Sequence, residues 1–276
     1  MRLARFIFIS LIIIFFPVFS YAEGYLKIHF IGLEGAEAIL LECGQEYALI
    51  DTGSEQASGK LINYLQQKRV SKIKYIILTH HHEDHASGVF EILNKFEVGQ
   101  VFDNGMRLHK NVSLERRYVE VVRSKKNFHI LEAGDRIRLG GEAYLDVFWP
   151  VNKDEYSDND TSLVMKLTYH GFSCLFTGDL NNKGEKRLLI LKPDLKANIL
   201  KVGHHGYKDA TSEEFLTAVS PEAGIVNVAS WWPFDLVAEA LVKSKIKIYR
   251  TDKDGNIVVI VKPDGQYAIE TSRNNP

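Results

Sequence analysis

Short apolar runs rich in β-branched and aromatic residues recur along the chain, and segments with helical spacing of apolar residues separate them. The runs predict strands at 27–31, 38–43, 47–50, 74–79, 99–102, 137–139, 144–148, 163–168, 173–176, 198–202, 225–228, 247–249, 257–261 and 267–269. The helical spacing predicts helices at 61–65, 86–96, 113–126, 188–191, 211–219 and 236–241. The helix at 211–219 begins with Thr211 and Glu214 at the spacing of a capping box. This alternation predicts an α/β protein, in which a mixed sheet system carries outer helices.

The first residues have the pattern of a cleaved signal peptide. Arg2 and Arg5 form a basic start, residues 6–19 are mainly apolar, and residues 20–22 have the small-x-small form of a cleavage site. The apolar run is shorter than the roughly 20 residues that a membrane span needs. We expect residues 1–22 to be removed and residues 23–276 to form a single exported domain, periplasmic or secreted, with no stable membrane span. An uncleaved anchor is the alternative.

Composition and charge narrow the classes of partner. The chain is 45% hydrophobic and 25% charged, as in an ordinary globular protein, and its net charge is −1. Nucleic acid is therefore possible but not favoured as a partner, and a small-molecule or nucleotide-like substrate fits better. A local basic groove is an alternative to a solvated helix face, which we favour. The groove would use Arg107, Lys110, Arg116, Arg117, Arg123, Lys125 and Lys126.

One loop concentrates metal-ligand side chains. His80, His82, Asp84 and His85 form an H-x-H-x-D-H pattern between the predicted strand at 74–79 and the helix that follows. Neutral imidazole and carboxylate are ligands that suit Zn²⁺ and its neighbours. All four side chains cannot comfortably surround one ion at this spacing, but they can serve two adjacent ions. A chance cluster of histidines in a polar loop is the alternative.

Other predicted strands also end in ligand-type residues. Asp51 follows the strand at 47–50, Asp179 follows the strand at 173–176, and His204 and His205 follow the strand at 198–202. Asp51 alone is equally well explained as a turn residue. Four strand ends that all deliver acidic or histidine side chains nevertheless predict one metal cleft along one edge of the sheets. The two cysteines, Cys43 and Cys174, lie in apolar runs, which favours buried thiols over a disulfide.

These motifs resemble the metallo-β-lactamase superfamily, and within it the ComEC-like branch found at the C-terminal end of DNA-uptake channels. The H-x-H-x-D-H loop is highly specific for the superfamily. The branch is indicated by 159–164 (Asn-Asp-Thr-Ser-Leu-Val), 177–179 (Thr-Gly-Asp) and 204–206 (His-His-Gly). The resemblance covers roughly residues 25 to 262 and implies an αββα sandwich, which is two mixed sheets with helices outside.

The resemblance also implies a dinuclear site, usually with two Zn²⁺ ions and with Mn²⁺ possible. His80 and His82 would bind the first ion, Asp84 and His85 the second, and Asp179 would bridge them. One of His204 and His205 would complete the second site. Asp51 would orient the ligand loop from behind. Many superfamily members carry a further histidine for the first ion, where this chain offers Asn159 and Asp160 as weak ligands or supporting residues.

Two departures from the branch concern the substrate. Branch members usually have Ser after His-His-Gly and a His-Pro-His element before the next helix. This chain has Tyr207 at the first position and Trp231, Trp232 and Phe234 around the second. The aromatic side chains are candidates for stacking on a flat substrate, with core packing as an equal alternative.

The predicted reaction is metal-assisted hydrolysis, with a hydroxide held between the ions, near Asp84 and Asp179, as the nucleophile. Three functions follow. The first is an exported phosphodiesterase or nuclease, which the branch favours. The second is a hydrolase of carboxylic esters, lactones or β-lactams, because the same metal core can perform that chemistry. The third is a non-catalytic binding protein on the same fold.

Overall fold

The structure of the protein is a computed structural model. It describes residues 25–106, 112–151, 159–230, 240–241 and 243–273. The predicted signal peptide and the aromatic residues Trp231, Trp232 and Phe234 lie outside these residues. Among the helices that are described, none is long and apolar enough to cross a membrane.

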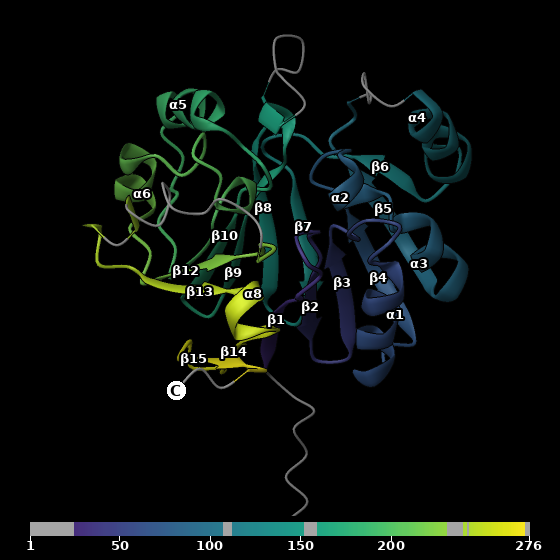
Figure 1. Ribbon diagram of the computed structural model, residues 1–276, viewed down its shortest axis with the longest axis horizontal. Helices are drawn as coiled ribbons and strands as arrows, with labels where there is room; N and C mark the ends of the chain where they lie inside the picture. The colour runs from purple at the N-terminus through teal and green to yellow at the C-terminus, as the bar shows by residue number, and fades with distance from the viewer. Residues whose placement is uncertain (1–24, 107–111, 152–158, 231–239, 242, 274–276) are drawn as a thin grey trace, which may run out of the picture.

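Two β-sheets form the centre of the molecule (Figure 1). The first sheet has the strand order β15 (Tyr267–Thr271), β14 (Ile257–Val261), β1 (Leu26–Phe30), β2 (Ile39–Cys43), β3 (Glu46–Ile50), β4 (Lys72–Ile77), β5 (Glu97–Asp103) and β6 (Phe128–Ile130). The second sheet has the order β13 (Lys247–Arg250), β12 (Ala223–Val226), β11 (Ile199–Lys201), β10 (Phe172–Phe176), β9 (Val164–Tyr169), β8 (Ala143–Trp149) and β7 (Arg136–Gly140). Both sheets are mixed, with an antiparallel half and a parallel half.

Helices cover the outer face of each sheet. The first sheet carries α1 (Ser58–Gln67), α2 (Glu83–Ala86), α3 (Val89–Lys95) and α4 (Val112–Tyr118), and the second carries α5 (Asn182–Ile190) and α6 (Glu213–Val219) (Figure 1). A short helix, α8 (Thr251–Asp254), joins β13 to β14. Three buried clusters fill the spaces between these layers: one between the sheets and one under each helix layer. The αββα sandwich predicted from the resemblance is confirmed.

The parallel half of each sheet explains why the ligand-bearing segments meet. Strands β3 to β6 run parallel in the first sheet, and strands β10 to β13 run parallel in the second. The carboxyl ends of parallel strands lie at the same edge, and active sites of open α/β sheets form there. The segments after β3, β4, β10 and β11 all leave the sheets at this edge.

Some local features differ from the sequence predictions. The short strand β6 and the helix α8 were not predicted, because each is too short to produce a periodic pattern. The helix at 211–219 begins one residue later than its motif suggests: Ser212 accepts a hydrogen bond from Phe215 N at 3.2 Å. Thr211 Oγ1 instead accepts from Gly203 N at 3.0 Å, so it holds the histidine turn. Cys43 and Cys174 are buried free thiols, as predicted.

A polar network fixes α1 to the outer face of the first sheet. Lys27 Nζ donates to Glu42 Oε1 at 2.7 Å, and Glu42 Oε2 lies 3.2 Å from His29 Nε2. The other ring nitrogen of His29 lies 2.8 Å from the Tyr64 hydroxyl on α1. Burial raises the pKa of Glu42, but the hydrogen bonds from His29 and Lys27 outweigh it and lower the pKa to about 2.

We predict that Glu42→Gln lowers the free energy of unfolding at pH 7 by about 2 kcal/mol. A carboxyl group whose pKa is lowered on folding stabilises the protein above its unfolded pKa. That stability is lost as the pH falls from about 4.5 towards 2. Urea unfolding at pH 7 and pH 3 measures the difference, and it should shrink at pH 3.

Glu46→Gln is the matched control, because Glu46 follows on the next strand and its side chain is 44% exposed. The prediction is contradicted if the free energies of unfolding of wild type and Glu42→Gln differ by the same amount at pH 7 and pH 3.

Candidate metal centre

Four side chains from three loops converge on one point. His85 Nε2 lies 3.1 Å from His205 Nε2 and 3.3 Å from Asp179 Oδ2. Asp84 Oδ2 lies 3.2 Å from His205 Nε2, and Asp179 Oδ2 lies 3.6 Å from it. Ligand atoms around a tetrahedral Zn²⁺ are about 3.3 Å apart, given metal–ligand bonds of about 2.0–2.1 Å. The spacing of the atoms from His85, His205 and Asp179 therefore fits one divalent cation, and Asp84 Oδ2 lies at its margin, 4.0 Å from His85 Nε2.

A second group shares Asp179 with the first. His80, His82 and Asp179 bring one ligand atom each within 4.8 Å of one another. The rings of His80 and His82 have centroids 4.8 Å apart, and His80 Nε2 lies 3.7 Å from Asp179 Oδ2. The buried atoms His80 Nε2 and Asp179 Oδ1 make no hydrogen bond, which is costly unless another partner satisfies them. The residues thus also fit a second cation, with Asp179 between the two.

The histidines present the same ring nitrogen to the centre because the other one is held from behind. His85 Nδ1 lies 2.8 Å from Asp51 Oδ2, and His205 Nδ1 donates to Asn227 O at 2.8 Å. His80 Nδ1 lies 3.1 Å from Thr79 Oγ1, which donates to Asp51 Oδ2 at 2.8 Å. In each ring Nε2 faces the centre. Such supporting hydrogen bonds fix the orientation and basicity of metal-binding histidines.

The charges of the cluster also suit a cation. Burial raises the pKa of Asp179, but His85 and His205 outweigh it and hold the pKa well below its ordinary value. Burial, helped by His85, lowers the pKa of His80 well below its ordinary value. Asp179 is therefore an anion and His80 a neutral imidazole, and these are the forms that bind metal.

The other candidates lie around this centre. Of the two adjacent histidines, His205 lies in the four-atom group, whereas His204 lies at its rim with Nδ1 2.8 Å from Asp209 Oδ1. Asn159 Nδ2 donates to His204 Nε2 at 3.3 Å, and the ring of Tyr207 lies 5.3 Å from that of His204. Asp160 lies elsewhere: its Oδ1 accepts from Gly184 N at 3.2 Å, at the start of α5.

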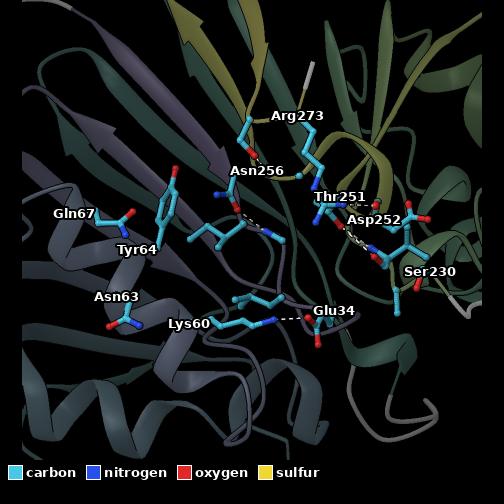
Figure 2. A pocket seen from close by; sticks show the side chains of 17 residues that line it. Glu34, Lys60, Asn63, Tyr64, Gln67, Ser230, Thr251, Asp252, Asn256 and Arg273 are labelled. Carbon is cyan, nitrogen blue, oxygen red and sulfur yellow. Dashed lines mark hydrogen bonds and ion pairs between the residues drawn. The ribbon is translucent and has the colours of Figure 1, made fainter. Parts of the chain in front are cut away.

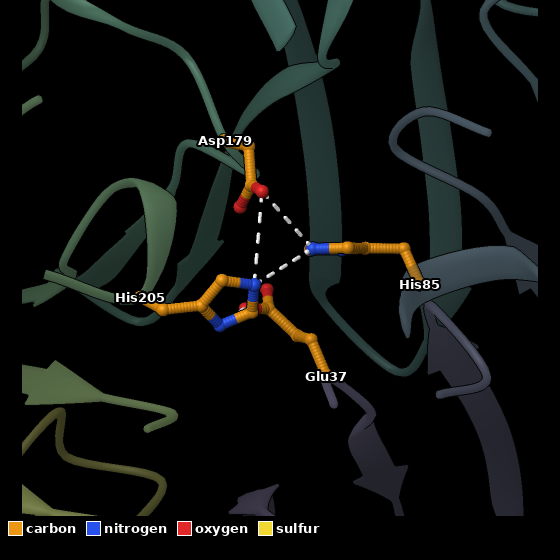
Figure 3. A group of neighbouring side chains, drawn as sticks. All are labelled: Glu37, His85, Asp179 and His205. Atoms are coloured by element: carbon orange, nitrogen blue, oxygen red, sulfur yellow. Dashed lines mark hydrogen bonds and ion pairs between the residues drawn. The ribbon is translucent and has the colours of Figure 1, made fainter. Parts of the chain in front are cut away.

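Sequence reasoning missed Glu37 and Lys201. Glu37 joins His85, Asp179 and His205 in a group whose ligand atoms lie within 4.8 Å of one another (Figure 3). Lys201 Nζ lies 2.5 Å from Glu37 Oε2, and both side chains are almost fully buried. Nothing in the spacing of Glu37 marks it. Lys201 could have been recognised from the sequence, because it is a charged residue within the mainly apolar run 198–202.

Two hollows lie beside the centre. The smaller, of about 200 Å³, is lined by Asp84 and His205 together with Leu33, Glu34 and Ala229. The larger, of about 570 Å³, shares these last three residues and extends between α1 and α8 (Figure 2). Its wall carries the ion pair of Glu34 with Lys60 and, across the cavity, Asn256, Asp252 and Arg273. The two hollows therefore adjoin at the segment that contains Glu34.

Two of the basic residues proposed for a groove have internal partners. Arg117 lies over the Phe90 ring at 3.9 Å and pairs with Glu55 at 3.4 Å. Arg123 pairs with Asp103 at 3.0 Å. Arg107 and Lys110 lie outside the described residues, as do the aromatic candidates Trp231, Trp232 and Phe234. Within the described part of the chain, these contacts favour a structural role for Arg117 and Arg123.

Comparison with known proteins gives concordant matches. A family model described as "Metallo-beta-lactamase superfamily" matches residues 31–228. The curated protein "ComE operon protein 3" of Bacillus subtilis (strain 168) is 30% identical over 205 residues, which cover 71% of this chain and 26% of that protein. "Competence protein ComA" of Neisseria gonorrhoeae is 27% identical over 224 residues, which cover 79% of this chain and 30% of that protein. The chain thus spans less than a third of the length of either relative.

A solved structure shares the fold at lower identity. The metallo-beta-lactamase fold protein YhfI from Bacillus subtilis is similar with a TM-score of 0.57 and 12% sequence identity. The similarity covers 90% of this chain and 100% of that one.

We predict that Asp179→Ala loses metal while the protein stays folded. Wild-type protein purified with excess Zn²⁺ should hold up to two ions per chain. The variant should hold at most one, because a shared carboxylate offsets the repulsion of two cations about 3.5–4 Å apart. Elemental analysis measures the content, and circular dichroism checks the fold.

Asp194→Ala is the control, because this carboxylate is 75% exposed and its partners, Lys166 and the backbone of Lys196, take no part in the candidate metal centre. Wild-type metal content in Asp179→Ala would mean that Asp179 is merely a turn residue at the end of β10.

Proposed function

The chain belongs to the metallo-beta-lactamase superfamily, and on that premise we propose that it is an exported metal-dependent hydrolase of phosphodiester bonds. The observation that carries the proposal is the pair of ligand groups that share Asp179 at the meeting edge of the two sheets. Catalytic metal sites keep a position open to water or substrate, and here the hollow beside Asp84 and His205 supplies the access.

The relatives support the choice of phosphodiesters. The two curated relatives described above are long proteins, one named for the ComE operon and the other for competence, and they confirm the ComEC-like resemblance seen in the sequence. The match covers 26% of the first and 30% of the second, so their activities are carried over to this chain only as part of this proposal. Nucleotide-like phosphodiesters are the substrates that this kinship favours.

The residues of the chain have separate tasks in such a reaction. When bound, a pair of divalent cations lowers the pKa of water and polarises the attacked oxygen. Asp51 and Thr79 hold the imidazoles in place. The side chain of Asp84 is 45% exposed. Burial raises the pKa of Asp84, but His85 and His205 keep it below its ordinary value. Asp84 therefore stays anionic at neutral pH and can accept a hydrogen bond from the attacking water.

A second candidate is the hydrolysis of a carboxylic ester, lactone or β-lactam. The net charge of −1 and the internal pairing of Arg117 and Arg123 favour a small substrate over a long polyanion. The same metal core can attack a carbonyl group, so the two candidates differ only in the substrate.

We predict that the protein loaded with Zn²⁺ or Mn²⁺ hydrolyses bis(4-nitrophenyl) phosphate at least about tenfold faster than a γ-lactone or nitrocefin, relative to the uncatalysed reactions. Short single-stranded DNA serves as a second phosphodiester. Asp84→Asn, assayed at saturating metal, should lower kcat more than it raises KM, because the carboxylate acts on the metal position and the attacking water and not on the bound substrate.

Preference for the lactone or for nitrocefin would replace the first candidate by the second. A protein that holds its full metal content but hydrolyses none of these substrates would favour the third function predicted from the sequence, a non-catalytic binding protein on the same fold.

Export is the other part of the proposal. Its support is the basic start and the apolar run of residues 6–19. When the complete chain is expressed in a Gram-negative host, we predict a periplasmic product whose intact mass corresponds to cleavage after Ala22. A replacement of Ala22 by Arg should block processing. A cytoplasmic product of full mass in the wild type would contradict export.

A further inference from the structure

A buried ion pair lies directly behind the metal centre. Glu37 Oε2 and Lys201 Nζ are 2.5 Å apart, and the two side chains are 1% and 0% exposed. Glu37 belongs to the segment that leads into β2 of the first sheet, and Lys201 is the last residue of β11 in the second. The pair therefore connects the two sheets at the edge where the ligands gather.

Both residues are tied to neighbours of the ligands. Glu37 N donates to Asp84 O at 2.9 Å, and Gly53 N donates to Glu37 O at 2.8 Å. Lys201 Nζ donates to Gly178 O at 3.1 Å, next to Asp179. The positions of the carboxylate and the ammonium group are thus set by the same backbone that positions the ligands.

The Glu37 carboxylate is close enough to act as a ligand itself. It offers an oxygen within 4.8 Å of ligand atoms of His85, Asp179 and His205 (Figure 3). Glu37 Oε2 also lies 3.9 Å from His205 Nδ1, the ring nitrogen that donates to Asn227 O and faces away from the metal position. This oxygen has the ammonium group of Lys201 nearby but makes no well-aligned hydrogen bond, so part of its bonding capacity is unused. A carboxylate in this state would bind a cation readily.

We propose that Lys201 withholds Glu37 from the metal at the His85–His205 position and so keeps a coordination position open for substrate and water. The inference rests on the metal site of the proposed function. His85, His205 and Asp179 already offer three atoms to that position, and Asp84 Oδ2 lies at its margin, 3.2 Å from His205 Nε2 and 4.0 Å from His85 Nε2. A further carboxylate would close the site, and sites that are fully ligated by protein are structural and not catalytic.

The role of Lys201 follows from its charge. A buried carboxylate without a partner is strongly unfavourable, and removal of one partner of a buried ion pair leaves such a group. Without the ammonium group, the cation nearest to Glu37 is the metal. Lys201 and the metal therefore compete for the same carboxylate, and in the native protein Lys201 holds it.

The test compares Lys201→Met, which frees the carboxylate, with the double variant Glu37→Gln/Lys201→Met, which removes it as well. Zn²⁺ affinity is measured by competition with a chelator, and the ligand field is measured from the absorption spectrum of the Co²⁺ form. We expect Lys201→Met to bind the second ion at least about tenfold more tightly than wild type, with a changed Co²⁺ spectrum. The double variant should return both properties to wild-type values.

The double variant keeps the test usable if Lys201→Met does not fold without metal. It has no charged side chain at either buried position, so it should fold without metal. If Glu37 is already a ligand in the wild type, the double variant will bind Zn²⁺ at least about tenfold more weakly, and the proposal is wrong. The proposal is equally wrong if Lys201→Met binds no more tightly than the double variant. Neither measurement uses turnover. A wild-type protein that binds metal but hydrolyses no substrate would contradict the proposed function. The affinity measurements would still decide this inference.

Discussion

The metal centre depends on one buried carboxylate, that of Asp51. It accepts hydrogen bonds from Thr79 N at 2.7 Å and from Thr79 Oγ1 at 2.8 Å, and it lies 2.8 Å from His85 Nδ1. Asp51 adopts a left-handed backbone conformation, with φ of 57°, which is uncommon outside glycine. The hydrogen bonds of Asp51 offset the free-energy cost of this conformation and of full burial. They fix Thr79 at the start of the ligand loop and the imidazole of His85 at its end.

The architecture explains how residues distant in sequence reach the same ions. Each sheet changes from antiparallel to parallel pairing, and the parallel halves end at a common edge. Asp179 and His205 come from the second sheet, whereas the histidine loop comes from the first. A change that moved the sheets relative to each other would separate the two halves of the ligand set, and the buried core between the sheets opposes such a movement.

The part of this site that the sequence predicted is the part that local spacing determines. The H-x-H-x-D-H loop lies within six residues, so its pattern can be read without the fold. Asp179 and the two histidines were found because each follows an apolar strand. Glu37 has no such signal, because its importance comes from Lys201 on the opposite sheet. Similarly, the position of Asp160 is explained by its hydrogen bond with Gly184 N and not by a metal. Only the packing of α5 brings these two residues together.

The buried charges around the centre form a set that is consistent with metal binding. Asp51, Asp179 and Glu37 are almost fully buried, and Lys201 is the one fully buried ammonium group among the described residues. Burial raises the pKa of Glu37, and Lys201, His85 and His205 act against this rise. The remaining carboxylates face imidazoles, among them that of His85. Burial lowers the pKa of His85, but Asp179, Asp51 and Asp84 raise it well above its ordinary value. A divalent cation in the first group would neutralise Asp179, and a cation in the second group would give His80 Nε2 the partner that it lacks, so both groups suit metal.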